Sequence, residues 1–137
     1  MNTPNEVRLI RPEGLVTSAA FSHAAVVPST ATTVYVGGQN GVDADGNLVG
    51  ADDVAAQTGQ ATTNVETALT TCGATLADVI SWSIYVIDGA DLHAAFGAVA
   101  SRLDPDADPA LVTVAMVAGL AVPGALVEMS TIAAVLP

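Results

Sequence analysis

The stretch VYVGGQNGVDADGNLVGADDVAAQTGQATTNVETAL, residues 34–69, carries the strongest local structural signals in the chain. β-branched residues at 32–38 predict a strand that ends in two glycines, and the Asp-Gly and Gly-Asn pairs that follow are turn residues. Asp52 or Asp53 is a suitable N-cap for a helix that ends at Gly73. Apolar residues at helical spacing form one stripe on this helix: Val54, Ala61, Val65, Leu69 and Cys72.

The turn between the strand and the helix resembles the start of a calcium loop. Asp43, Asp45 and Asn47 stand at alternate positions. An EF-hand loop needs Gly at its sixth position and Glu at its twelfth, but these places hold Leu48 and Val54. Such a turn could hold at most a weakly bound surface ion, and no other group of residues has a recognisable metal-ligand spacing. We therefore expect a turn here and no metal site.

The remaining elements extend this unit in both directions. Strands are predicted at 7–11 and 19–27 before it, and at 78–88, 110–118 and 125–135 after it, with a second amphipathic helix at 90–103. The order βββαβαββ indicates one α+β domain over residues 1–137, with a six-stranded mixed sheet and two helices on one face. Because the strands carry apolar residues on both sides, we expect the second face to pack against neighbouring subunits.

The composition excludes several classes of function. The 137 residues include 14 acidic residues, 3 Arg and no Lys, which gives a net charge of −11. This field repels nucleic acid and anionic membranes. Without Lys, the chain cannot form a side-chain Schiff base or a P-loop phosphate contact. The single Cys72 excludes an internal disulfide and every CxxC motif, and its place on the helix stripe predicts that it is packed.

No segment of the sequence predicts export or membrane insertion. The first 14 residues lack the apolar core of a signal peptide. The uncharged run 110–127 is interrupted by Pro123-Gly124, and its β-branched residues indicate buried strands instead of a membrane helix. We expect a cytoplasmic protein.

Two titratable residues are candidates for chemistry. Glu128 is a lone acid between Val127 and Met129. Such a carboxylate either reaches solvent or is desolvated, and a desolvated carboxylate suits general acid or base catalysis. A lone His such as His23 is more often structural than catalytic. A triad of Ser22, His23 and Glu128 is disfavoured because adjacent strand residues point to opposite faces.

Taken in order, these pieces resemble the Rid family, also called YjgF or L-PSP. The resemblance rests on AAFSHAAVV, on the stretch quoted first, on CGATLADVISWSIYVIDGADLHAAF and on VPGALVEMSTIAAV, and it covers nearly all of the chain after about residue 12. It implies a chorismate-mutase-like homotrimer whose sheets form an inner barrel, with small-molecule clefts between subunits. It also implies hydrolysis of reactive enamines or imines to keto acids and ammonia, without a cofactor.

The residues that the family uses in its cleft are largely replaced in this chain. The family's carboxylate-binding Arg, which follows a Pro-Ala pair, corresponds to Leu111 or Val112. The family Tyr in the early strand corresponds to Phe21, and the Asn of the second helix corresponds to Phe96. The family Cys becomes Thr113 or Val114. Glu128, which in the family positions the attacking water, and the backbone of Gly38 are retained.

These replacements predict a diverged family member with an apolar cleft. A buried carboxylate without its Arg would be left unpaired, so we expect a small neutral or apolar ligand. In one hypothesis, Glu128 hydrolyses or tautomerises an imine-, enamine- or enol-like compound, helped by His23. In the alternative, the protein is a non-catalytic small-molecule-binding trimer. The replacement of the family Arg disfavours the usual 2-imino acid deaminase activity. Endoribonuclease activity is the least favoured of these functions, because the net charge of −11 repels RNA.

Overall fold

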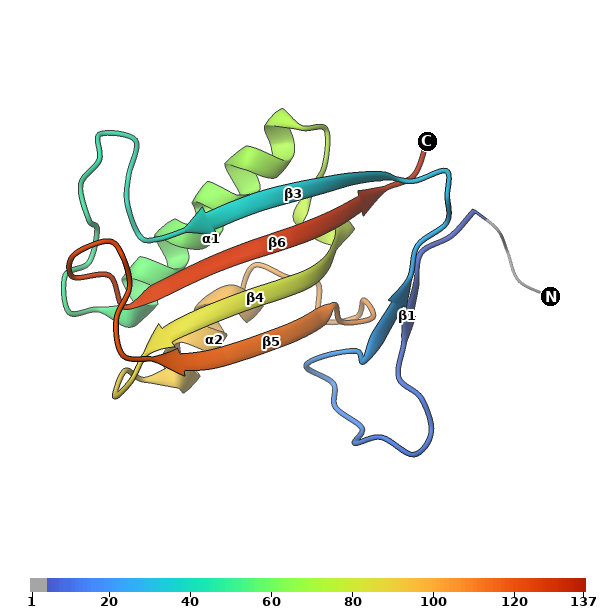
Figure 1. Ribbon diagram of the computed structural model, residues 1–137, viewed down its shortest axis with the longest axis horizontal. Coiled ribbons are helices and arrows are strands. Elements are labelled where there is room, and N and C mark those ends of the chain that lie inside the picture. Colours follow the sequence, from blue (N-terminus) through green and yellow to red (C-terminus); the bar gives the residue numbers. More distant parts are fainter. Residues whose placement is uncertain (1–4) are drawn as a thin grey trace.

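The computed structural model describes residues 5–137 and shows an α+β fold in which two helices cover one face of a mixed sheet (Figure 1). The predicted order of strands and helices is confirmed. The elements are β1 (Arg8–Ile10), β2 (Ala24–Val26), β3 (Thr32–Gln39), α1 (Val54–Thr71), a 3₁₀ turn (Leu76–Asp78), β4 (Val79–Ile87), α2 (Leu92–Ala100), β5 (Leu111–Val117) and β6 (Val127–Val135).

The main sheet has four strands in the order β3-β6-β4-β5. β6 lies between β3 and β4 and is antiparallel to both, whereas β4 and β5 are parallel. The parallel pair requires a crossover, which the chain makes through α2. The last strand of the chain is therefore central, and its residues have neighbours on both sides.

The single six-stranded sheet that the sequence predicts is not observed. β1 and β2 form a separate two-stranded antiparallel sheet beside the free edge of β5. One isolated bridge, between Ser22 and Leu111, connects the two sheets. At this junction the Ser22 N–H donates to Ala110 O at 3.1 Å, and its hydroxyl donates to Pro109 O at 2.6 Å.

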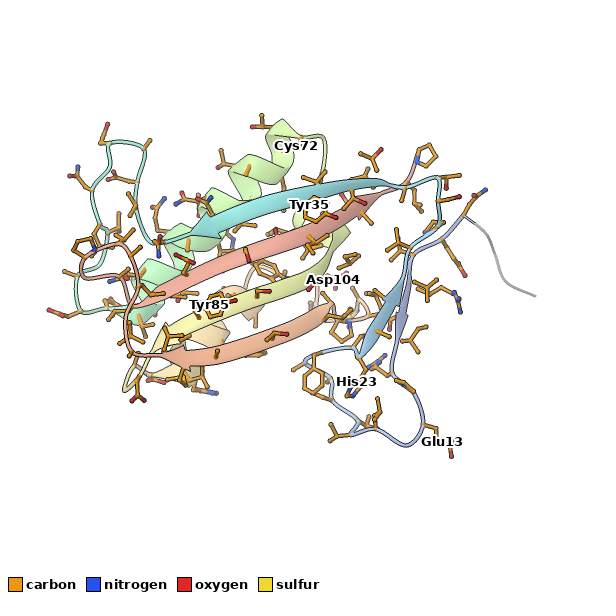
Figure 2. The ribbon with its side chains drawn as sticks, in the orientation of Figure 1. Glu13, His23, Tyr35, Cys72, Tyr85 and Asp104 are labelled. Atoms are coloured by element: carbon orange, nitrogen blue, oxygen red, sulfur yellow. The ribbon has the colours of Figure 1, made fainter. Side chains whose placement is uncertain are left out.

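Helix α1 begins and ends as the sequence predicts. The Asp53 side chain accepts a hydrogen bond from Ala56 N at 3.0 Å, and Gly73 follows the helix with φ of 79°. The prediction for Cys72 is wrong, because this residue is exposed. Cys72 is the C-cap, with φ of −92° and ψ of 7°, so it leaves the helical path and no longer continues the apolar stripe. Figure 2 shows it at the end of the helix.

The hydrophobic core lies between the helices and the sheet. Alternate residues of β4 and β6 point into it, and α1 contributes its apolar stripe. Its buried members include Val65, Leu69, Trp82, Ile84, Val86, Val127 and Met129. The opposite face of the sheet has no covering element among residues 5–137 (Figure 1).

In the turn that resembles a calcium loop, the Asp43 carboxylate forms hydrogen bonds with backbone N–H groups of the same turn. The Asp43 carboxylate accepts hydrogen bonds from Asp45 N at 2.9 Å and Asn47 N at 3.0 Å. Gly46 adopts a φ of 83°, which favours glycine. In residues 5–137, no group of three or more His, Cys, Asp or Glu is arranged to hold a metal ion.

Candidate functional site

The uncovered face of the sheet, called here the open face, carries hydroxyl groups as well as apolar side chains. Figure 2 shows Tyr35 of β3 and Tyr85 of β4 on this face, and they are 75% and 37% exposed. Ser83 lies in register with Ser130 on one side and with Thr113 on the other. The open face is therefore mixed in character, and the row of hydroxyl groups gives it capacity for polar recognition.

Glu128 stands on the open face between Tyr85 and Gly38. It is the direct antiparallel partner of Tyr85, so their side chains are neighbours. A Cβ built on Gly38 would lie 3.0 Å from both Cδ and Oε2 of Glu128, so the carboxyl group packs against the bare Cα of this glycine. The register between β3 and β6 shifts between Val36 and Gln39, which marks a bulge at the glycine pair. Among the described residues, no hydrogen bond or ion pair engages the Glu128 carboxylate.

A set of side-chain amides fixes the chain next to Glu128. Asn40 Nδ2 donates to Val127 O at 3.0 Å, and Asn64 Nδ2 donates to Asn40 O at 3.1 Å. The fully buried Gln57 receives a hydrogen bond from Leu126 N at 2.8 Å. Helix α1 therefore holds Leu126 directly through Gln57 and Val127 indirectly through Asn64 and Asn40, immediately before Glu128. An amide inside an Ala/Thr-rich helix gives no sequence signal for this role.

Leu111 and Thr113 also lie on the open face, but at the far end of β5. Leu111 is in register with Ser81, which lies four residues before Tyr85, the partner of Glu128. Four residues along a strand span about 13 Å and two strand spacings about 10 Å, so the Leu111 and Glu128 Cα atoms are roughly 16 Å apart. A single small ligand cannot contact both side chains within one chain.

Phe21 and His23 lie beside the start of β5. Their rings meet edge to face, with centroids 5.3 Å apart and an interplanar angle of 77°. The His23 Nε2 lies 2.7 Å from Val16 O, an arrangement in which the ring N–H donates to the carbonyl. This contact ties His23 to its own loop, whose tip residues Leu15 and Val16 are exposed.

The remaining predicted site residues, Val112 and Phe96, lie on the helix side of the sheet. Val112 is in register with the buried Trp82, whose side chain points toward the helices. Phe96 of α2 is 42% exposed. Both line a cleft of about 550 Å³ on that side. The structure therefore separates the predicted residues into three groups instead of bringing them together in one chain.

Two of the three arginines are engaged in surface ion pairs away from Glu128. Arg11 contacts Asp108 at 3.0 Å, and Arg102 contacts Glu66 at 2.7 Å. Neither pair includes a residue of the open face. In the part of the chain that the structure describes, no helix combines the length and the apolar character needed to span a membrane.

The comparisons with known proteins identify the family. Residues 13–135 match the family described as Endoribonuclease L-PSP. The crystal structure of YyfB from Yersinia pestis, described as a protein of unknown function of the conserved Rid protein family, is 34% identical. The match covers 93% of this chain and 97% of that chain, with a TM-score of 0.78. The chain therefore belongs to the L-PSP family, also called Rid and YjgF, as its sequence predicts.

Two further structures show the same fold. Rv2704 from Mycobacterium tuberculosis, described as a member of the YjgF/YER057c/UK114 family, is 31% identical over 95% of this chain and 100% of that chain, with a TM-score of 0.59. RidA from an Antarctic Psychrobacter is 24% identical over 86% of this chain and 96% of that chain, with a TM-score of 0.66. Because RidA is only 24% identical, its likeness to this chain shows the fold alone.

Proposed function

We propose that this L-PSP-family protein forms a homotrimer that binds a small neutral or apolar compound between subunits, next to Glu128. The observation that carries the proposal is the uncovered sheet face, where Glu128 stands beside Tyr85 and against Gly38. A broad sheet face with tyrosines and aliphatic residues is a surface that other subunits cover in oligomers.

The proposed site takes residues from two subunits. Within one chain, Leu111 and Glu128 are roughly 16 Å apart by strand register. When the open faces of neighbouring subunits meet in a closed ring, the Leu111 end of one subunit can approach the Glu128 end of the next. Phe21 and Thr113 then lie on the Leu111 side of the cleft, and Gly38 lies on the Glu128 side.

The same arrangement supports Leu111 as the counterpart of the family Arg. Leu111 shares the open face with Glu128, whereas Val112 points to the helix layer beside Trp82. An aliphatic residue at this place offers a ligand carboxylate no charge-assisted hydrogen bond. The proposed ligand is therefore uncharged where it meets Leu111.

The proposed reaction is the hydrolysis of a neutral imine. The Glu128 carboxylate accepts a proton from water while the water oxygen bonds to the imine carbon and the C=N electron pair moves to nitrogen. Glu128 passes this proton to nitrogen, which gives the neutral carbinolamine. Glu128 then moves the carbinolamine O–H proton to nitrogen, and the C–N bond breaks as the C=O bond forms, which gives the carbonyl compound and the free amine. Tyr85, the neighbour of Glu128, supplies a hydroxyl that can donate to the imine nitrogen, where the electron pair develops.

The experiment compares Glu128→Gln with Ser130→Ala, which alters the same face of the same strand. Each variant and the wild type are assayed for aldehyde release from the imine of benzaldehyde and methylamine, and crystals are soaked with a library of neutral and carboxylate metabolites. We expect trimers in sedimentation, density for neutral compounds beside Glu128, and loss of rate enhancement in Glu128→Gln alone. Binding without any rate enhancement would favour the non-catalytic trimer, and a monomer in sedimentation would refute the inter-subunit site.

A further inference from the structure

The cleft lined by Val112 and Phe96 lies on the helix side of the sheet, away from the open face. This helix-side cleft is enclosed by the 3₁₀ turn, the end of α2, the loop 103–110 and residues 19–20 of the N-terminal loop. Its volume of about 550 Å³ falls in the usual range of small-molecule pockets. It is formed within one chain, so it needs no second subunit.

The floor of the cleft is apolar and partly aromatic. Trp82, only 3% exposed, lines it together with Val112 and the partly buried Leu76 and Leu103. Phe96 contributes a second aromatic ring. A floor of this kind favours the burial of a hydrocarbon or aromatic body, and aromatic rings also attract cations.

The rim of the cleft is acidic. Three carboxylates line it, those of Glu66, Asp104 and Asp108, against the single guanidinium of Arg102. Arg102 is paired with Glu66 at 2.7 Å. Asp108 is paired at 3.0 Å with Arg11, which is not a lining residue. Among residues 5–137, no cationic side chain lies within ion-pair distance of Asp104, whose Oδ1 accepts only the Asp106 N–H at 2.9 Å.

The geometry points to a binding site for a protonated amine with an apolar or aromatic body. The ammonium group meets the Asp104 carboxylate at the rim, and the body lies on Trp82 and Val112. An anionic ligand is disfavoured, because the lining groups sum to −2 and the whole chain carries −11. This site is independent of Glu128 and of the proposed reaction.

Trp82 is the only tryptophan of the chain, so its fluorescence reports on the floor of this cleft. The test titrates the wild-type protein with 2-phenylethylamine, 2-phenylethanol, phenylacetate and methylamine. We expect a saturable change in Trp82 emission that is strongest for 2-phenylethylamine and weaker for the alcohol. Phenylacetate and methylamine are expected to cause no saturable change, because the first has the wrong charge and the second has no body to bury.

Variants separate this site from general attraction to an acidic protein. Asp104→Asn keeps the Oδ1 acceptor and should weaken 2-phenylethylamine binding about two- to fivefold. Asp106→Asn makes the same charge change in the same loop, but outside the lining, and should have a smaller effect. Ala77→Phe fills the cleft from its exposed edge and should abolish the saturable change, whereas Ala55→Phe on the exposed side of α1 should not.

Three results would overturn the proposal. The first is equal binding of 2-phenylethylamine by the wild type and Ala77→Phe, and the second is equal weakening by the two Asp→Asn variants; either would indicate non-specific attraction. The third is an absence of binding together with a changed oligomeric state in Ala77→Phe, which would make the cleft an interface between copies of the chain. Glu128→Gln should leave 2-phenylethylamine binding unchanged, so this test and the imine assay fail independently.

Discussion

Replacing Gln57 with Leu should be among the most destabilising single substitutions in α1. Gln57 is fully buried and connects the helix to two loops. Its Nε2 donates to Gly50 O and Gly124 O, both at 3.2 Å, and its Oε1 accepts from Leu126 N at 2.8 Å. Leucine has a similar size but can form none of these hydrogen bonds.

The expected loss of stability in Gln57→Leu follows from the backbone groups that lose their hydrogen bonds to Gln57. Gly50 O keeps a second hydrogen bond from Asp53 N at 2.9 Å. The Leu126 N–H and the Gly124 carbonyl have no other hydrogen-bond partner among residues 5–137. Leu126 is partly buried and Gly124 is exposed, so water can hydrate the Gly124 carbonyl and the Leu126 N–H carries most of the cost. A buried polar group left unpaired costs about 1–3 kcal/mol, so Gln57→Leu should lower the free energy of unfolding by about 2 kcal/mol. For a chain of this size, this corresponds to a fall in Tm of roughly 6 °C.

Thermal and urea unfolding followed by circular dichroism measures this cost. Gln60→Leu is the matched control, because Gln60 forms a single side-chain bond, to Asn64 Oδ1 at 2.9 Å, and is only partly buried. It should cost about 1 kcal/mol or less. Native-state hydrogen exchange should also show faster exchange of the Leu126 amide in Gln57→Leu. Equal costs for the two variants, or an unchanged Leu126 amide, would refute the assignment of Gln57 as the bridge between the loops.

Two further predictions concern single positions on β3 and β6. Gly38→Ala should displace the Glu128 carboxyl by a few tenths of an ångström in a crystal structure and should reduce the rate of imine hydrolysis. Gly37→Ala is the control and should have neither effect, because its Cβ would meet nothing within 4 Å. Thr131→Val should raise the free energy of unfolding by about 1 kcal/mol in urea denaturation, because the Thr131 hydroxyl is buried without a hydrogen-bond partner among residues 5–137. Thr62→Val should not raise the free energy of unfolding, because the Thr62 hydroxyl donates to Thr58 O at 2.8 Å. An equal gain in the free energy of unfolding for Thr62→Val and Thr131→Val would contradict the explanation by the unpaired Thr131 hydroxyl.

The local elements could be predicted from the sequence because their signals are local. The cap at Asp53, the turn at Gly73 and the alternation along β4 each depend on residues a few positions apart. The order of strands in the sheet depends on pairing between β6 and residues about 40 to 100 positions earlier, which no local pattern specifies. The division into two sheets escaped prediction for the same reason.

The candidate site could be predicted only in part. Glu128 is conspicuous as an acid among apolar residues, but its neighbours Tyr85 and Gly38 become known only from strand register. The alternation of β4 indicates that Tyr85 shares a face with Ser83, and this was the one signal that could have found it. The family resemblance groups Phe96 and Val112 with Glu128, whereas the structure places them in the helix-side cleft.

We propose that this L-PSP-family protein uses Glu128 in its site and that Leu111 stands where a carboxylate-binding side chain would be needed. The most direct test is a coupled assay for keto-acid release from 2-aminoacrylate, with the wild type and Leu111→Arg compared at equal concentration. We predict that the wild type does not exceed the uncatalysed rate and that Leu111→Arg does, because the arginine restores a partner for the carboxylate. Robust keto-acid release by the wild type would contradict the claim.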